Sequence, residues 1–359
     1  MAYKQIEVEE FLRLAVNFPV LDVRSPSEYE HAHIPKAYSF PLFSDEERAI
    51  VGTLYKQSSR EAAIRRGLDF FGPKLNHYLT EAEQIIARHG MARSEKTPFL
   101  VHCWRGGMRS AGIAWLLDLY GYDVYTLKGG YKAFRNWVLG QFTKEWNIRC
   151  LGGYTGSGKT EILDGLRKAG EYMIDLERLA RHKGSAFGGI GQPEKQPSQE
   201  MFENELAIRL QECAALTTDE LTDRIWIEDE SQRIGCVNIP QPLWERMKSS
   251  ELVFMDIPFE KRLEYVTREY GRLDRSLLVA AVSRLQKKLG GLETKDAIGY
   301  ILDGDLANGF SILLKYYDKL YLKALDKKRG KLDSFERLMF DEVEPMAISE
   351  KILAKYGRK

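Results

Sequence analysis

A cysteine followed by two arginines stands in the segment FLVHCWRGGMRS, residues 99–110. The apolar run before Cys103 is typical of a buried strand, and a helical apolar pattern follows Arg109. Backbone N–H groups converge where a strand meets a helix N-terminus, so this position lowers the pKa of a thiol and favours a bound anion. Two glycines between the arginines let the loop curl, because glycine tolerates positive φ. We predict that Cys103 is a reactive thiol and not a packing residue, with Arg105 and Arg109 as its anion-binding partners.

A phosphate-binding pattern follows in GGYTGSGKT, residues 152–160. It matches the Walker A motif in full, after an apolar strand and before a helical pattern, which is the context that such a motif requires. The predicted diphosphate-binding residues are Gly153, Thr155, Gly156, Ser157, Gly158, Lys159 and Thr160. Lys159 would neutralise a diphosphate, and Thr160 would hold Mg²⁺ if that metal is bound. The pattern specifies a diphosphate, whereas nothing in the sequence reads a nucleotide base.

Acidic residues at the ends of apolar strands are candidate partners for a metal ion or a water at this loop. The candidates are Asp175, Glu228, Asp229 and Asp256. Acids at strand ends are common in α/β folds, so each is as compatible with a surface position as with a role. The run Glu228–Glu230 is the best candidate, because it ends an apolar strand as a Walker B motif does.

The composition is that of an ordinary globular protein, and the length exceeds one domain. Of its 359 residues, 44% are hydrophobic and 29% are charged, and the formal net charge is +1. A nucleic-acid site would therefore have to be a local patch. The four cysteines form no CxxC pair, which indicates neither a disulfide scaffold nor a zinc site.

The N-terminal residues lack the apolar core of a signal peptide, and no apolar run is long enough to cross a bilayer. We therefore expect a cytoplasmic protein with reduced thiols and no membrane partner.

Strands and helices alternate along the chain, which predicts an α/β fold with parallel sheets. The expected strands lie at 18–24, 98–103, 123–130, 148–153, 171–177, 223–230 and 251–258. The region 260–359 is helix-rich and charged. We expect two domains, 1–140 and 146–359, with the boundary within 136–147.

The N-terminal motifs resemble the rhodanese sulfurtransferase family. The resemblance lies in LDVRSPSEYEHAHIPKAYSFPL, residues 21–42, and in LKGGYKAFR, residues 127–135. It implies a rhodanese-like parallel-sheet domain in which Cys103 carries a chalcogen atom. The loop from Cys103 to Arg109 is one residue longer than in common rhodaneses, as in phosphatases built on that fold, and it suits a phosphate-sized anion. The loop contains no carboxylate to act as general acid, which weakens the phosphatase alternative without excluding it. The chalcogen carrier that the resemblance implies, together with a phosphate-sized loop, suggests a donor that is both, namely selenophosphate or thiophosphate.

Taken together, the motifs resemble the bacterial tRNA 2-selenouridine synthase family over the full length of the chain. They are CWRGGMRS, GGYTGSGKT, LARHKGSAFG, QPSQEMFENEL and IEDESQRIG. The resemblance implies a rhodanese-like domain fused to a P-loop NTPase-like α/β domain with a helical extension. It further implies conversion of wobble 2-thiouridine to 2-selenouridine in tRNA, by S-geranylation from geranyl diphosphate and then selenation from selenophosphate. No tightly bound cofactor is implied, and the partners are the anticodon region of tRNA and small phosphates.

Under this resemblance Cys103 would take selenium as a perselenide, held by Arg105 and Arg109. The P-loop would grip the diphosphate leaving group of geranyl diphosphate as charge develops on it, although ATP or GTP binding stays open. A C10 chain also needs an apolar pocket, for which 185–191 and Met201-Phe202 are plausible positions, although such residues more often belong to a core or a loop.

A row of lysines is the strongest candidate for an RNA surface. Lys315, Lys319, Lys323 and Lys327 recur every four residues in a helical pattern at 311–329. Tyr317, Leu320 and Ala324 would form its apolar face, and Lys328 and Arg329 would extend its positive end. The alternative is a solvated amphipathic face without a ligand. A second candidate surface includes Arg65 and Arg66.

Two other functions remain open from the residues alone. One is a phosphatase of the Cys-x5-Arg type, or a sulfurtransferase, regulated by a nucleotide-binding P-loop domain. The other is a P-loop kinase fused to an idle rhodanese module, against which the intact loop at Cys103 argues.

Overall fold

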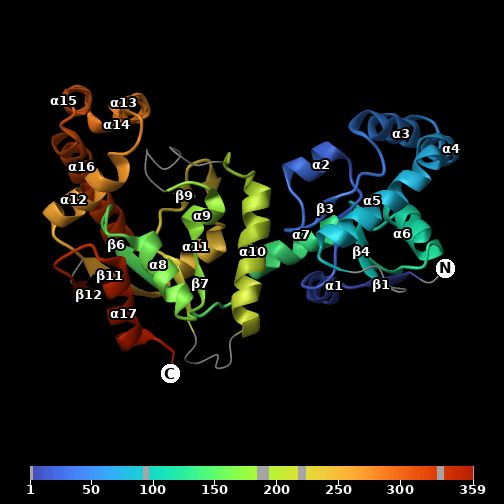
Figure 1. Cartoon of the computed structure of the whole chain (residues 1–359), viewed down its shortest axis with the longest axis horizontal. Coiled ribbons are helices and arrows are strands. Elements are labelled where there is room, and N and C mark those ends of the chain that lie inside the picture. The colour runs from blue at the N-terminus through green and yellow to red at the C-terminus, as the bar shows by residue number, and fades with distance from the viewer. Residues whose placement is uncertain (1–2, 92–96, 184–193, 217–223, 330–334, 359) are drawn as a thin grey trace. The chain divides into compact units, whose positions relative to one another are not determined.

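Two parallel sheets of five strands each organise the chain (Figure 1). The structure is a computed structural model, and the residues that it describes are 3–91, 97–183, 194–216, 224–329 and 335–358. The chain divides into two units, Met1–Gln141 and Phe142–Lys359. Each unit combines one parallel sheet with helices, which confirms the predicted α/β fold class.

The sheet of the first unit has the strand order β1-β5-β4-β2-β3, and every neighbouring pair is parallel. Its strands are β1 (Lys4–Ile6), β2 (Val20–Asp22), β3 (Tyr38–Ser39), β4 (Pro98–His102) and β5 (Asp123–Leu127). β4 lies at the centre, and Phe99, Leu100 and Val101 are fully buried in it. An unbroken apolar run is expected for a parallel strand that is covered on both faces.

Helices cover both faces of this sheet. They are α1 (Val8–Ala15), α2 (Pro26–His31), α3 (Asp45–Gln57), α4 (Arg60–Phe71), α5 (Leu75–Arg88), α6 (Met108–Leu119) and α7 (Gly130–Gln141). α1 contacts α7, whereas α5 contacts α6, and each pair has a helix that packs on β4 or β5. The central strand therefore ends, at its carboxyl end, between two helical layers.

The sheet of the second unit has the order β12-β11-β6-β8-β7 and is also parallel throughout. Its strands are β6 (Ile148–Gly153), β7 (Met173–Ile174), β8 (Ile225–Glu228), β11 (Glu251–Asp256) and β12 (Glu336–Met339). A short antiparallel hairpin joins β9 (Arg233–Ile234) to β10 (Val237–Asn238). The central strand of this sheet is β6, which leads directly into the P-loop.

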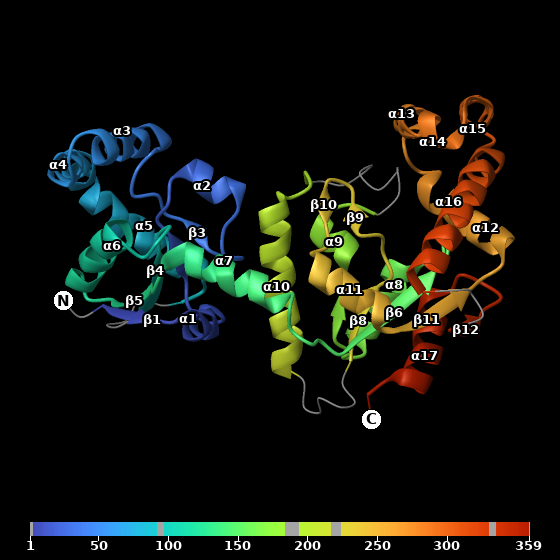
Figure 2. The same ribbon diagram turned by 180° about the vertical axis from the view of Figure 1, so that it is seen from behind.

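The helices of the second unit form two groups (Figure 2). Around the sheet lie α8 (Lys159–Lys168), α9 (Leu176–Ala180), α10 (Gln199–Leu216), α11 (Gln241–Ser249) and α17 (Pro345–Tyr356). The extension contains α12 (Phe259–Tyr270), α13 (Arg275–Arg284), α14 (Gln286–Leu289), α15 (Gly291–Asp303) and α16 (Leu306–Arg329). This extension has an apolar cluster of its own, to which α12, α13, α15 and α16 contribute.

Several elements differ from the sequence expectation: most expected strands are shorter, and β1, β3, β9 and β10 were not expected. The strand expected at 171–177 stops at Ile174, because Asp175 caps α9 by accepting a hydrogen bond from the Arg178 N–H at 2.7 Å. The strand expected at 123–130 stops at Leu127. The helix-rich region also contains the strand β12, which was not predicted because its sequence is charged and lacks an apolar run.

None of the helices in the described ranges combines the length and apolarity that crossing a bilayer would need.

The start of α7 packs against the loop that contains Cys103. The Tyr131 N–H donates to the Cys103 carbonyl at 2.8 Å, and the Lys132 N–H donates to the Trp104 carbonyl at 3.0 Å. Gly130 has a φ of +62°, and a Cβ there would lie 2.3 Å from the Cys103 carbonyl oxygen. Only glycine fits this approach of two backbones.

We predict that Gly130→Ala destabilises the first unit by at least about 2 kcal/mol, through backbone strain and overlap with the loop. Urea denaturation measures this change. Gly140→Ala is the matched control in the same helix: no atom lies within 4 Å of its Cβ position, so it should leave stability unchanged or raise it. Equal stability of the Gly130→Ala variant and the wild type would contradict the prediction.

Candidate active site

The Cys103 thiol lies one residue beyond β4, inside a loop that ends at the N-terminus of α6. Its side chain is nearly buried, with 3% of the residue exposed. The Gly107 N–H donates to Sγ at 3.3 Å, and the Ser110 Oγ lies 3.3 Å from the same sulfur. Burial raises the pKa of the Cys103 thiol, but hydrogen bonds with Ser110 and Gly107 and the charge on Arg109 outweigh it, so the pKa falls below its usual value. This arrangement favours the thiolate, the form that acts as a nucleophile.

The two arginines of the loop differ in their surroundings. Arg105 is exposed. Arg109 is partly buried, and its guanidinium donates to Glu28 Oε2 at 2.8 Å. Glu28 also accepts from the Ser25 N–H at 3.1 Å and lies 3.7 Å from Arg48. The structure therefore brings Arg109 and Cys103 together and adds a carboxylate, which comes from α2 and not from the loop.

This carboxylate bears on the phosphatase alternative, which the absence of an acid within the loop had weakened. Burial raises the pKa of Glu28, but the hydrogen bond and charge of Arg109 outweigh it, and the pKa lies below its usual value. An acid that stays ionised is a poor proton donor to a leaving group. Glu28 therefore positions Arg109, and it does not supply the missing general acid.

The rhodanese-like motif supplies a buried ion pair that supports the Cys103 loop through Tyr131. Arg24 donates through Nε to both Asp22 oxygens at 2.9 and 3.0 Å and through a terminal nitrogen to the Ala32 carbonyl at 2.7 Å. Its guanidinium lies 3.8 Å from the centre of the Tyr131 ring. Tyr131 is also the residue whose N–H donates a hydrogen bond to the Cys103 carbonyl. A buried ion pair with several hydrogen bonds is rigid, so it gives Tyr131 a firm support beside the Cys103 loop.

The P-loop closes tightly between β6 and α8. Gly156 and Gly158 have φ values of +82° and +72°. A Cβ on Gly156 would lie 2.6 Å from Val266 Cγ2, so this glycine permits close packing of the loop on α12. The Ser157 Oγ donates to the Tyr154 carbonyl at 2.7 Å, and Lys159 Nζ donates to the Gly153 carbonyl at 2.9 Å. The seven predicted diphosphate-binding residues thus belong to one continuous loop and helix start.

Three carboxylates gather beside this loop. Glu177, Glu228 and Glu230 each have an oxygen within 4.8 Å of the others. The Thr160 hydroxyl donates to Glu177 Oε2 at 3.1 Å. In the described part of the chain Glu228 Oε1 is buried and has no hydrogen-bond partner. A set of hard oxygen ligands with an unsatisfied member fits a divalent cation such as Mg²⁺.

The acidity of these groups reflects their crowding. Burial and the charge on Glu230 raise the pKa of Glu177 to about 8, although Lys159 and Thr160 oppose the shift. Burial, followed by the charges on Asp175 and Glu177, raises the pKa of Glu228 well above its usual value. All three carboxylates cannot ionise together at low cost unless a cation compensates them.

The other acids proposed from the sequence are not members of this set of three. Asp175 caps α9, as described above, and its carboxyl also shares a hydrogen bond with Glu228, so it adjoins the cluster. Asp229 accepts from the Tyr321 hydroxyl at 3.0 Å and from Lys328 Nζ at 2.6 Å. Asp256 pairs with Arg337. Of the acids proposed from the sequence, Glu228 and its neighbour Glu230 reach the P-loop cluster.

The helical extension holds the P-loop from its other side. Arg262 on α12 is buried and donates to the Thr155 carbonyl at 3.0 Å. Its guanidinium forms a bidentate pair with Asp318 on α16, at 2.9 and 2.7 Å. On the same helix the Tyr321 hydroxyl accepts from the Gly153 N–H at 3.3 Å. Side chains of the helical extension therefore stabilise the P-loop by hydrogen bonds to its backbone.

The lysine row lies on the outer face of α16. Lys315, Lys319, Lys323 and Lys327 are all exposed. The expected apolar face was wrong in part, since Leu320 and Ala324 are exposed too. Lys328 does not extend the row either, because it is only 9% exposed and is paired with Asp229. The buried face includes Leu313, Leu314 and Leu325.

The remaining candidates are dispersed. Arg65 and Arg66 are exposed on α4, where Arg66 pairs with Asp69 at 3.4 Å. Met201 and Phe202 are buried in α10. The segment 185–191, proposed for an apolar pocket, lies outside the described residues.

Six residues at these sites were not identified as functional from the sequence. They are Glu28, Ser110, Glu177, Arg262, Asp318 and Tyr321. Only Glu177 carried a usable signal, since it stands two residues after Asp175 in a run that the sequence marked as acidic.

Two family models match the chain. A rhodanese-like domain matches residues 7–136, and a model described as the tRNA 2-selenouridine synthase AAA domain matches residues 146–303.

Several curated relatives carry the name tRNA 2-selenouridine synthase. The protein of Bdellovibrio bacteriovorus is 32% identical, over 91% of this chain and 94% of its own. That of Hydrogenovibrio crunogenus is 33% identical, over 90% and 94%. That of Nitrosomonas europaea is 36% identical, over 70% of this chain and 63% of its own length. Among solved structures, a yeast protein tyrosine phosphatase of the rhodanese family matches at 16% identity and a TM-score of 0.25, over 38% of this chain and 86% of that one, which is too low to inform on function.

We predict that Ser110→Ala raises the pKa of the Cys103 thiol, because it removes a hydrogen bond that stabilises the thiolate. The rate of alkylation by iodoacetamide, followed against pH in a Cys236→Ser background that lacks the exposed thiol, reports this pKa as a midpoint. The midpoint should move to higher pH. Ser44→Ala, which removes a helix cap in the same unit, is the control and should leave the midpoint in place. An unchanged or lower midpoint for Ser110→Ala would refute the assignment.

Proposed function

The chain belongs to the tRNA 2-selenouridine synthase family, and from this membership we propose that it is a tRNA-modifying transferase that replaces the sulfur of wobble 2-thiouridine with selenium. The observation that carries the proposal is the Cys103 loop, in which a nearly buried thiol of lowered pKa is held by Gly107 and Ser110 near Arg109. Because tRNA is its substrate, we place the protein in the cytoplasm.

In the selenation step the Cys103 thiolate attacks the selenium of selenophosphate. The S–Se bond forms and the P–Se bond breaks with its electron pair on phosphorus, so phosphite leaves, a perselenide remains on Cys103, and no external oxidant is needed. Arg109, oriented by Glu28, binds the anionic donor, and the exposed Arg105 contributes further charge. The perselenide attacks C2 of the modified uridine, the C–Se bond forms and the alkylated sulfur leaves. A thiol reductant then cleaves the S–Se bond and restores Cys103.

Geranylation prepares that leaving group. A C2 thiolate leaves poorly, whereas the geranyl thioether leaves more readily. We assign geranyl diphosphate to the P-loop, where the backbone of residues 153–160 and Lys159 would receive the diphosphate as the allylic C–O bond breaks and the C–S bond forms.

We propose that Mg²⁺ accompanies the diphosphate and that Thr160 and the carboxylates of Glu177, Glu228 and Glu230 hold it. This set supplies oxygen ligands and includes a buried carboxylate oxygen without a partner in the described ranges. When bound, the ion supplies positive charge that neutralises the diphosphate. No other cofactor enters the proposal.

We further propose that the lysine row on α16 binds tRNA phosphates. Four exposed lysines with four-residue spacing form a positive strip on a protein whose net charge is only +1. Such a strip positions RNA without reading its sequence. Arg65 and Arg66 are a second, weaker candidate, since Arg66 is already paired.

The two chemical steps can be separated by substitution. We predict that wild type incubated with selenophosphate gains one selenium by intact mass and that Cys103→Ala gains none. Lys159→Ala should still load selenium but lose geranyl transfer to 2-thiouridine tRNA by about 10²- to 10³-fold, a typical loss for one charge-stabilising donor. Cys236→Ser, which removes an exposed thiol, is the control and should retain both activities. Selenium loading that persists in Cys103→Ala would end the proposal for the thiol.

The RNA surface is tested by salt dependence. Replacing Lys315, Lys319, Lys323 and Lys327 by Gln should weaken tRNA binding and flatten the slope of log K against log[salt] by about 3, since each lost phosphate contact removes roughly 0.7–0.9. A control of equal charge change elsewhere in the same unit uses the exposed lysines Lys287, Lys288, Lys295 and Lys351. An equal slope for both variants would reject the lysine row as the RNA site.

A further inference from the structure

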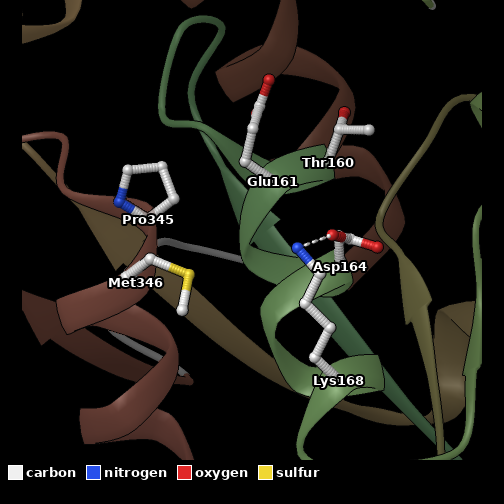
Figure 3. Close-up of a pocket in the computed structure, with 6 residues that line it drawn as sticks. All are labelled: Thr160, Glu161, Asp164, Lys168, Pro345 and Met346. Carbon is white, nitrogen blue, oxygen red and sulfur yellow. Dashed lines mark ion pairs between the residues drawn. The ribbon is translucent and has the colours of Figure 1, made fainter.

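A hollow of about 410 Å³ opens between α8 and α17 (Figure 3). Its lining residues are Thr160, Glu161, Asp164, Lys168, Pro345 and Met346. Four come from α8, from Thr160 near its start to Lys168 at its end, and two come from the start of α17, which faces them across the hollow.

The hollow adjoins the P-loop directly. Thr160, the last residue of the Walker A motif, is one of its walls. A Cβ on Gly158 would lie 3.2 Å from Val343 and 3.4 Å from Pro345, so the loop touches the segment that forms the opposite wall. Beside the hollow the two helices are in direct contact, since the Ser349 Oγ on α17 donates to the Ile162 carbonyl on α8 at 3.1 Å. A group attached to a diphosphate on the P-loop could therefore enter the hollow without crossing another element.

The polar side chains of the lining are engaged with other residues. Asp164 pairs with Lys168 at 2.8 Å and with Arg167 at 2.6 Å. Glu161 shares a hydrogen bond with Tyr265. The groups left to meet a ligand are the Pro345 ring and the Met346 side chain, and Met346 is 60% exposed. An exposed, flexible thioether beside an anion-binding loop suits an irregular apolar ligand.

We propose that this hollow holds the hydrocarbon chain of a prenyl diphosphate whose diphosphate lies on the P-loop. The inference rests on the proposed function and adds the site of the chain. A cavity of about 150 Å³ accommodates the six carbons of benzene, so ten carbons need on the order of 250 Å³, which the hollow provides. The lining contains no aromatic ring on which a nucleotide base could stack, and aliphatic surface favours the prenyl chain as occupant.

The test compares geranyl diphosphate with inorganic pyrophosphate, which lacks the hydrocarbon chain, and with ATP, which carries a nucleoside instead. Isothermal titration calorimetry of the full-length protein in Mg²⁺ buffer measures the binding of all three. Met346→Asp should weaken geranyl diphosphate at least tenfold, equivalent to about 1.4 kcal/mol, and leave pyrophosphate within twofold of wild type. The conservative variant Met346→Leu should bind geranyl diphosphate with the affinity of the wild type. Met339→Asp, at a methionine of similar exposure (68%) on β12 in the same unit, is the matched control and should change neither ligand.

Three results would overturn the inference: unchanged binding of geranyl diphosphate by Met346→Asp, an equal loss for both diphosphates, or a loss confined to ATP. Lys159→Ala separates this failure from that of the proposed function. If Lys159→Ala weakens the binding of both diphosphates while Met346→Asp weakens the binding of neither, the hollow is excluded as the chain site and the P-loop assignment stands. If Lys159→Ala weakens the binding of neither diphosphate, both assignments fail.

Discussion

Both sites depend on the junction at which a central parallel strand runs into a helix, because the first N–H groups of a helix have no partner within the helix. In the first unit this junction joins β4 to α6 and contains Cys103, and in the second it joins β6 to α8 and contains Lys159. Each is the central strand of its sheet, and the helix that follows presents its positive end to the loop. The same geometry serves different chemistry because one loop adds a thiol and the other adds an ammonium and a hydroxyl.

The surroundings shift the pKa of the acidic groups at the two sites in opposite directions. Around Cys103, hydrogen bonds and a nearby guanidinium outweigh burial, so negative charge is stabilised on the sulfur. Around Glu177 and Glu228, burial and mutual repulsion destabilise negative charge, so these carboxyls resist ionisation. A thiolate ready to react and a carboxylate cluster that needs a cation are two outcomes of the same balance between desolvation and hydrogen bonding.

The sequence predicted what is local and missed what is assembled at a distance. Strand, loop and helix succeed each other within a few residues at both anion sites, so the fold class and the seven residues of the P-loop could be identified from the pattern. Glu28 meets Arg109 across 81 positions, Arg262 meets Thr155 across 107, and Tyr321 meets Gly153 across 168. No periodicity links such pairs. Asp175 shows how one residue can have two roles that the sequence does not separate, since it caps α9 and also shares a hydrogen bond with Glu228.

The involvement of α16 in the P-loop has a practical consequence for dissecting the chain. Asp318 and Tyr321 reach the loop from this helix, directly or through Arg262, and Lys328 reaches Asp229 beyond β8. A minimal fragment that kept the sheet of the second unit and deleted residues 259–329 would strip the loop of these supports. It would also remove Lys328, whose ammonium now pairs with the buried carboxylate of Asp229. Domain truncation is therefore a poor route to an isolated diphosphate-binding module from this chain, and internal substitutions preserve its architecture better.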